Sequence, residues 1–287
     1  MVSVSCAFIS DDGREYTGDV ILSLGSFDAA YSTAARVVRG YVLGGKWTFP
    51  KKVKRIKRLL SPLPPERTRS VRAVGFNYIY HAEQLKVTIP TFPILFFKPW
   101  TALAGPFDDV PITSGYQNST NFTSKMNYEA ELVVVVGRKV FNVSEDEALD
   151  AVLGCWIRCV ASRMVDREGR EASAQLAMGK NDDGWGPWGP ALTLKEEIED
   201  VQSLNIWLKV NGVTKRNAST ADMIFGVRQI VSFFSMGITL HPGDIIFTGT
   251  PSGVQLGALN PVWLTDGDVV ETGLDQLGTC SNRLAYT

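Results

Sequence analysis

Two glutamates, Glu129 and Glu131, stand near the start of an apolar segment, MNYEAELVVVVG, that covers residues 126–137. The apolar run and its closing glycine predict a strand buried on both faces. Side chains alternate along a strand, so the two glutamates point the same way. Two like charges beside a core repel each other and lose hydration, and a divalent cation would compensate them. The alternative is a strand end that has emerged into solvent, where the pair would cost little.

Four further segments contain groups suited to acid–base chemistry or anion binding. A single histidine is more often structural than catalytic, and the chain has only two. No segment identifies a site by itself. The last one ends in a Thr/Ser/Gly turn that could direct several backbone N–H groups at an anion. The segments are GFNYIYHAEQ with His81, FFKPWTALAGP with Lys98, MGKNDDGWGPWGP with Lys180, and LHPGDIIFTGTPSGV, which covers residues 240–254.

Taken in order, these segments resemble the fumarylacetoacetate hydrolase family from about residue 70 to about residue 255. The most specific parts are YEAEL, GKNDDGWGPWGP and PGDIIFTGTPSGV. The resemblance implies a mixed α/β, sheet-dominated fold, with a β-roll or barrel-like catalytic domain behind a small N-terminal α+β domain. It also implies a homodimer and a bound Mg²⁺, Mn²⁺ or Ca²⁺. Family members act on 1,3-dicarbonyl or 2-oxo acid substrates by carbon–carbon bond hydrolysis, decarboxylation or keto–enol isomerisation.

The resemblance also suggests roles for individual residues. A metal polarises the substrate carbonyl, a lysine stabilises the oxyanion, and a histidine moves a proton near neutral pH. The implied metal ligands are Glu129 and Glu131. Lys180 matches the lysine that faces the oxyanion, and His81 matches the histidine that orients or deprotonates water. The candidate substrate-binding residues are Tyr78, Lys98, Asp183 and Thr250.

The chain departs from the family at the third metal ligand. The family segment reads like G-Y-T-V-x-N-D-V-S and supplies an aspartate, whereas this chain has GCWIRCVAS with Val160 at that position. Valine cannot ligate a cation, and cation affinity falls with ligand count. Asp166 lies six residues further on, and using it would need a local rearrangement. Cation binding is therefore expected to be weakened or absent.

A second departure concerns the partner of His81. The family has a glutamate three residues later, where this chain has Gln84. Glutamine can orient the imidazole but cannot stabilise an imidazolium by charge, so water activation should weaken. Glu83 could take over only if the helix register shifted. Next to Asp183, Asp182 replaces an aromatic residue of the family, which indicates a changed substrate.

Three functional hypotheses follow. The first is an enzyme repurposed towards isomerisation, decarboxylation or cyclisation through an enol or enolate, as in specialised metabolism. The second is a conventional metal-dependent carbon–carbon hydrolase or decarboxylase. The third is an inactive ligand-binding scaffold, which the retained histidine and lysines argue against. Four tryptophans near the motifs could line a pocket for a larger apolar ligand or belong to the core: Trp100, Trp156, Trp185 and Trp188.

Composition narrows the class of protein. Of the 287 residues, 45% are hydrophobic and 21% charged, which is typical of a globular protein. A net charge of −1 argues against nucleic acid as the partner. No apolar run is long enough to cross a membrane, and no secretory signal is visible. Four scattered cysteines without CxxC spacing make zinc unlikely and fit a reduced, cytoplasmic setting. The expected partner is a small-molecule substrate.

The elements that must position these residues fall into two predicted domains, residues 1–65 and 66–287. The first should contain strands over 2–9 and 14–24 and a helix within 27–45, before a proline-containing linker at 61–70. In the second, strands alternate with helices at 144–154 and 220–237. Ser144 is the predicted N-cap of the first helix, with Glu147 at the capping-box position. NGV at 211–213 predicts a tight turn between strands.

Overall fold

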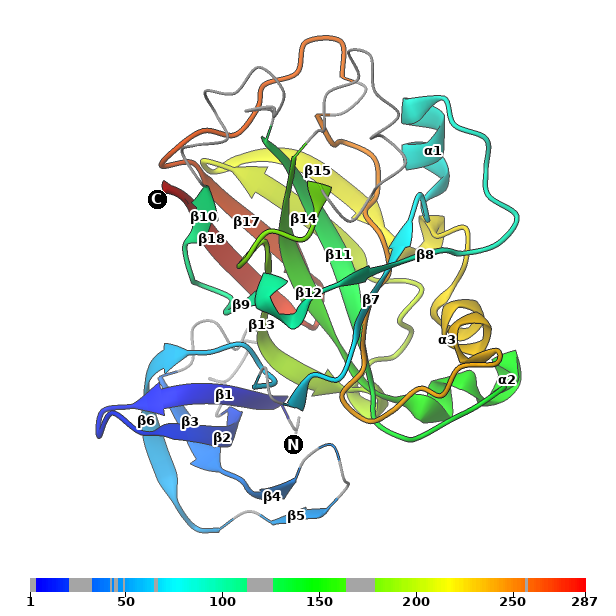
Figure 1. The fold of residues 1–287 in the computed structure, drawn as a ribbon. Coiled ribbons are helices and arrows are strands. Elements are labelled where there is room, and N and C mark those ends of the chain that lie inside the picture. The colour runs from blue at the N-terminus through cyan, green and yellow to red at the C-terminus, as the bar shows by residue number, and fades with distance from the viewer. Residues whose placement is uncertain are drawn as a thin grey trace.

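The computed structural model describes residues 4–20, 33–41, 43, 46–48, 50–64, 67–112, 126–163, 179–255 and 258–287. Strands dominate this part of the chain, as predicted (Figure 1). The strands are β1 (Val4–Ser10), β2 (Glu15–Val20), β3 (Ala34–Val37), β4 (Arg39–Tyr41), β5 (Lys46–Thr48), β6 (Val53–Leu59), β7 (Val71–Gly75), β8 (Ile94–Lys98), β9 (Leu103–Ala104), β10 (Val110–Ile112), β11 (Met126–Val136), β12 (Val152–Arg163), β13 (Gly186–Leu194), β14 (Asn205–Val210), β15 (Val213–Ser219), β16 (Ile245–Phe247), β17 (Val269–Leu274) and β18 (Gly278–Tyr286). The helices are α1 (Ile79–Leu85), α2 (Glu145–Ala148) and α3 (Val227–Ser235), with 3-10 turns η4 (Trp100–Ala102), η6 (Leu149–Ala151), η9 (Lys195–Glu197) and η10 (Thr220–Asp222).

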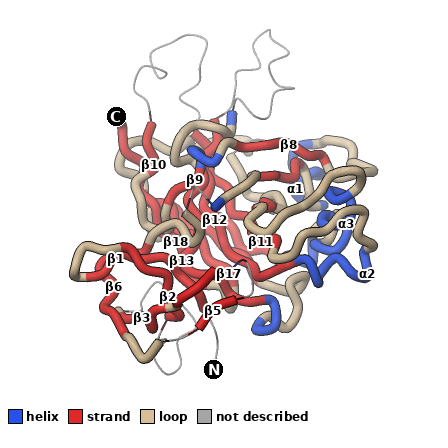
Figure 2. Tube along the Cα trace, turned by 60° about the horizontal axis from the view of Figure 1, so that its bottom comes forward, coloured by secondary structure: helices blue, strands red, loops and turns tan. Residues whose placement is uncertain are grey.

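Two sheets contain most of the strands. The larger runs in the order β2-β3-β6-β1-β13-β12-β11-β16-β7-β8, with β9 added to β13, and the smaller runs β10-β18-β17-β14-β15. A separate pair is formed by β4 and β5. The three α-helices gather on one side of the molecule in both views (Figures 1 and 2). The strands from β7 onward curl around a common interior, which is the barrel-like arrangement expected of this fold class.

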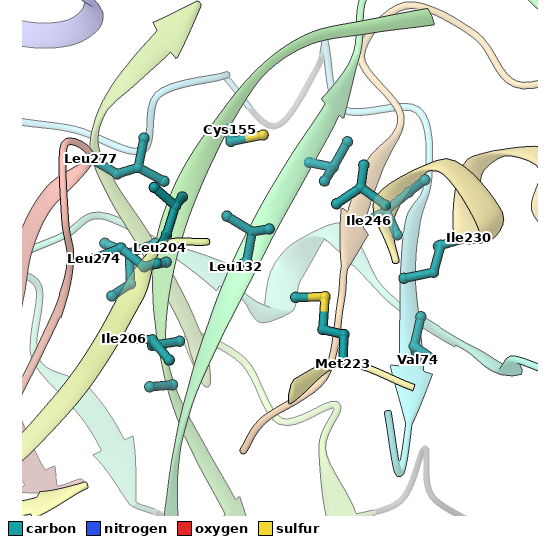
Figure 3. Close-up of a cluster of buried hydrophobic side chains, with 14 of the residues drawn as sticks. Val74, Leu132, Cys155, Leu204, Ile206, Met223, Ile230, Ile246, Leu274 and Leu277 are labelled. Carbon is teal, nitrogen blue, oxygen red and sulfur yellow. The ribbon is translucent and has the colours of Figure 1, made fainter. Parts of the chain in front are cut away.

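The main hydrophobic core lies where the two sheets and α3 face one another. Leu132 of β11 and Ile246 of β16 meet Ile206 of β14, Leu274 of β17 and Ile230 of α3 (Figure 3). Each of these side chains is almost fully buried. Residues far apart in sequence thus share one core, which fixes β11 at the centre of the domain.

Strand β11 is buried on both faces, and its apolar residues divide between two cores. Leu132 and Val134 belong to the main core, whereas Val133 and Val135 pack in a second cluster with Trp156. This division follows from the alternation of side chains along a strand. It confirms the prediction made from VVVV, and it fixes the register of the glutamates that precede these valines.

The N-terminal segment is strand-rich, and the helix predicted within 27–45 is wrong where the structure describes it. Residues 34–37 form β3 and residues 39–41 form β4. Burial in β3 alternates residue by residue, and β3 pairs with both β2 and β6, so the apolar pattern has the period of a strand. Residues 27–32 lie outside the described residues. Because β1 pairs with β13, this segment extends the large sheet, and a domain boundary at 65/66 stays a prediction.

Two local signals in the second half of the chain are confirmed, although the helices predicted at 144–154 and 220–237 are helical only over 145–151 and over 220–222 and 227–235. Ser144 is the N-cap of α2, and its hydroxyl accepts a hydrogen bond from the Glu147 backbone N–H at 3.3 Å. Asn211 and Gly212 have φ of 50° and 76° and join β14 to β15, as a tight two-residue hairpin turn requires. Among the described residues, no helix combines the length and apolar character needed to cross a bilayer.

The tryptophans separate into core and surface. Trp156, Trp185 and Trp188 are buried, which supports the core interpretation for all three, whereas Trp100 is 55% exposed. Trp156 and Trp188 form an edge-to-face pair with ring centroids 4.5 Å apart. Trp188 Nε1 also donates to Ser61 Oγ, so this ring ties the predicted linker to the core.

We expect Trp188→Ala to lower the free energy of unfolding by about 3–5 kcal/mol, because it leaves a large cavity in a packed cluster. Trp100→Ala is the matched control and should cost far less. Urea unfolding followed by circular dichroism measures both variants. Equal losses in the two variants would contradict the assignment of Trp188 to the core.

Candidate functional site

Glu129 and Glu131 are both buried. Glu129 is 4% exposed and Glu131 is 2% exposed, so the alternative of a strand end in solvent is excluded. Their positions on β11 place both on the face shared with Val133 and Val135. Across the ladder, Glu129 pairs with Val160 and Glu131 pairs with Arg158. Residues of opposite charge that lie directly opposite each other stabilise a sheet, and the second pair has this arrangement.

Lys180 neutralises Glu129. Its Nζ lies 2.6 Å from Oε1 and 2.7 Å from Oε2 of the carboxylate. The lysine belongs to the loop before β13, and its side chain is 21% exposed, against 6% for Glu129. An ammonium group has three N–H donors, so two contacts to Glu129 leave one for a substrate oxygen.

Glu131 has a different set of donors. Arg158 Nη1 lies 3.4 Å from Oε1, and the backbone N–H of Gly249 donates to Oε2 at 2.9 Å. Burial raises the pKa of Glu131, and the guanidinium of Arg158 opposes that rise. Gly249 has φ of +93°, and a Cβ there would lie 3.0 Å from the Cβ of Asn77 and 3.1 Å from the Val74 oxygen. A glycine is therefore needed where this backbone approaches the carboxylate.

His81 is held neutral beside the same carboxylate. It is buried on α1 and stacks on Phe76, with ring centroids 6.1 Å apart. Burial lowers its pKa to about 4, while the charge of Glu129 works in the opposite direction and those of Arg216 and Lys180 add to the drop. Its Nδ1 is buried and has no hydrogen-bond partner among the described residues. A neutral imidazole in this position can accept a proton at neutral pH.

Gln84 lies close to His81, but its side-chain amide is hydrogen-bonded to the backbone of a turn. Its Nε2 donates to the Val254 oxygen and its Oε1 accepts from the Gly253 N–H, both at 2.9 Å. It also interacts with His81 and favours the protonated imidazole weakly. Glu83 is exposed on the same helix, so the structure does not bring it into the site.

Three of the four candidate substrate-binding residues join this cluster. Thr250 Oγ1 accepts from the Ala130 N–H at 3.1 Å and from Arg216 Nη1, and Tyr78 is fully buried beside Glu131 and Arg216. Lys98 is 5% exposed, and its Nζ has no hydrogen-bond partner among the described residues.

Burial lowers the pKa of Lys98 well below its usual value, and the nearby cations Arg158 and Lys180 lower it further. Asp183, the fourth substrate-binding candidate, is exposed in the loop before β13. No described contact brings it to the cluster.

Sequence reasoning missed two arginines. Arg158 is 1% exposed and Arg216 is 4% exposed, and each interacts electrostatically with the glutamate pair. Burial lowers the pKa of Arg216 to about 10, and Glu129 is the main group that opposes this drop. The available signal was a charged residue inside the apolar run WIRCV. A buried charge in a strand needs a partner, and Glu131 is that partner.

Most of the cluster comes from five strands that are consecutive in the large sheet, in the order β12-β11-β16-β7-β8, while Arg216 comes from β15 of the smaller sheet and Lys180 from the loop before β13. Strand β12 contributes Arg158 and β11 the glutamates. The turn after β16 contributes Gly249 and Thr250, α1 after β7 contributes His81, and β8 ends at Lys98. Neighbouring strands therefore bring together residues that are far apart in the chain.

The described residues do not fit the family's three-carboxylate metal site. No group of three His, Cys, Asp or Glu side chains in this part of the chain could hold a metal. Val160 lies opposite Glu129 in the ladder. All four oxygens of the glutamate pair already contact Lys180, Arg158 or Gly249. Asp166 lies outside the described residues.

Comparison with known proteins agrees with this fold. The model of the fumarylacetoacetate (FAA) hydrolase C-terminal family matches residues 70–285. The chain is 38% identical over 207 residues to a putative hydrolase of Burkholderia cenocepacia, covering 71% of this chain and 70% of that protein. It is 40% identical over 235 residues to caffeoylpyruvate hydrolase of Neonothopanus nambi, covering 82% and 74% respectively.

A solved structure extends the likeness to the N-terminal segment. The crystal structure of 2-hydroxyhepta-2,4-diene-1,7-dioate isomerase from Mycobacterium marinum matches with a TM-score of 0.80 at 28% identity. The match covers 99% of this chain and 99% of that chain. Fold, motif order and relatives agree, and the chain belongs to the fumarylacetoacetate hydrolase family.

Proposed function

We propose that this protein is an enzyme that converts a 1,3-dicarbonyl or 2-oxo acid through an enol or enolate. The reaction is isomerisation, decarboxylation or cyclisation, as in specialised metabolism. The observation that carries this proposal is the pairing of a neutral imidazole with a fixed ammonium. His81 is neutral beside Glu129, and Lys180 is bound to that same carboxylate.

The relatives support this substrate class. One relative is named for a pyruvate derivative and another for a 2-hydroxydiene diacid, which is the enol form of a 2-oxo acid. Both names describe compounds in which a carboxylate lies next to an enolisable carbonyl. The buried Arg158 and Arg216, together with the partly exposed Lys180, outnumber the two glutamates, so an anionic substrate would balance the charge of the cluster.

The chain's own residues can carry out the proton transfer. The imidazole of His81 takes the proton from the carbon next to the carbonyl, and the C–H electron pair becomes the enolate. The free N–H of Lys180 stabilises the oxygen on which the negative charge develops. Return of the proton to oxygen or to another carbon gives the isomer, so atoms and charge balance without water or an oxidant.

Conventional hydrolysis is the second candidate, and the two hydrolase relatives favour it. That reaction needs a water activated by His81 and a group that stabilises the imidazolium. Gln84 is uncharged and its amide holds the 253–254 turn. Enolisation protonates His81 as well, but it needs no ordered water, and Lys180 is placed to stabilise the oxyanion that it forms.

Product analysis separates the two candidates. Oxaloacetate and acetylpyruvate are suitable probes, because ultraviolet absorbance follows enol–keto conversion and proton NMR identifies the products. Isomerisation should proceed faster than the spontaneous rate, and decarboxylation of oxaloacetate would release pyruvate. Release of acetate and pyruvate from acetylpyruvate would instead identify the hydrolase. No acceleration with either probe or their longer-chain analogues would refute the proposal.

Lys180→Met should lower kcat/KM by about 10²–10³-fold, because it removes the donor for the developing oxyanion. Lys195→Met, a lysine on η9 that pairs with Asp150, is the matched control and should retain activity. Steady-state kinetics on the better probe measures both. Unchanged kinetics in Lys180→Met would show that the ammonium does not take part.

The pH profile tests the state of His81. Its pKa is lowered to about 4, so the neutral, proton-accepting form persists as the pH falls. We expect kcat/KM to stay level from about pH 8 to about pH 5 and to decline as the pH approaches 4. An ordinary imidazole would lose its base form around pH 6.5. A midpoint near 6.5 would contradict the assignment, and His81→Gln should abolish activity across the range.

A further inference from the structure

We infer that Arg158 and Lys180 replace the divalent cation of the family, so that the glutamate pair is neutralised by the protein and binds no metal ion. This inference concerns the site to which the proposed function belongs. Its test measures cation binding without turnover, so either can fail while the other stands.

Each oxygen of the pair already has a positively charged or N–H donor. Lys180 contacts both oxygens of Glu129, at 2.6 and 2.7 Å. Arg158 lies 3.4 Å from one oxygen of Glu131, and the Gly249 N–H donates to the other at 2.9 Å. A divalent cation would have to bind carboxylate oxygens whose negative charge these donors already neutralise.

Arg158 is fixed in this position. Its guanidinium lies 3.9 Å from the centroid of the Phe247 ring, and the residue is 1% exposed. Gly186 packs beside it, since a Cβ at that position would lie in van der Waals contact with Arg158 Nε at 3.4 Å. A guanidinium does not lose its proton in a protein, so it cannot give way by becoming neutral. Its charge is a permanent part of the cluster.

Electrostatic repulsion adds to this steric argument. A cation between the glutamates would lie close to Arg158 and Lys180, and the buried Arg216 adds a third positive charge near Glu129. The repulsion grows with the product of the charges and is strong where water is excluded. The loss of the family's aspartate at position 160 and the presence of Arg158 act in the same direction. The lost aspartate removes negative charge from the surroundings of the glutamate pair, and Arg158 adds positive charge there.

As a consequence, the positive charge that acts on the substrate oxygen is a fixed part of the protein. A metal supplies positive charge to the substrate oxygen and is lost to chelators. In this site lysine and arginine side chains supply that charge from within the fold. A substrate anion then meets a preorganised cationic cluster rather than an exchangeable ion.

Titration with Mn²⁺, followed by electron paramagnetic resonance of the free ion, tests the inference on the intact chain. The wild type should show no saturable Mn²⁺ binding that depends on Glu129. Arg158→Ala combined with Val160→Asp removes the guanidinium and supplies a third carboxylate, and its Mn²⁺ affinity should exceed the upper limit set by the wild type by about 100-fold or more. Glu129→Gln in that background should remove the new site.

Two further variants keep the result interpretable. Val160→Asp alone retains Arg158 and should gain much less affinity than the double variant. Arg72→Ala removes another buried arginine, which pairs with Asp244 at 3.7 Å, and should gain none. Stoichiometric Mn²⁺ binding by the wild type that Glu129→Gln abolishes would overturn the inference. So would a double variant that is folded by circular dichroism and shows no gain.

Discussion

Two carboxylates buried on one strand are the constraint around which this site is arranged. A buried charge without a partner is strongly destabilising, and β11 cannot relieve the cost by moving, because its valines are fixed in two cores. A slip of one residue would send the glutamates to the opposite face together with every apolar side chain. The surrounding elements must therefore supply positive groups. They do so with Lys180 from a loop, Arg158 from β12 and the Gly249 N–H from the turn after β16.

This requirement links the fold to the chemistry. Strand β12 pairs with β11 over its whole length, and the register places Arg158 opposite Glu131. On the other side β16 pairs with β11 through Val133 and Phe247, which brings the following turn to the glutamates. Phe247 also supplies the ring on which Arg158 lies. The same short pairing therefore positions a backbone donor and orients the guanidinium.

The predictable parts of the molecule were those whose signal is local. Nearby residues alone determine three of these features: the apolar strand β11, the Ser144 cap and the Asn211–Gly212 turn. The order of the motifs identified the family. The helix prediction for residues 34–41 was wrong because apolar spacing over so few residues fits a helix as well as a strand. Pairing of β3 with β2 and β6 decides between the two. Arg158 was missed for a related reason. Its function depends on which residue of β11 lies opposite, and only the register supplies that information.

The state of His81 follows from the same arrangement. The imidazole is buried between one carboxylate and two cations, so burial and the charges of Arg216 and Lys180 outweigh the attraction of Glu129. The imidazolium that forms when His81 takes a proton, from carbon or from water, is stabilised by the charge of Glu129. Gln84 adds no charge to this support, and its amide fixes the 253–254 turn through two hydrogen bonds. A neutral imidazole next to a fixed ammonium suits a reaction in which a proton leaves carbon and charge appears on oxygen. Lys180, which neutralises Glu129, is thus also placed to stabilise the oxygen of an enolate.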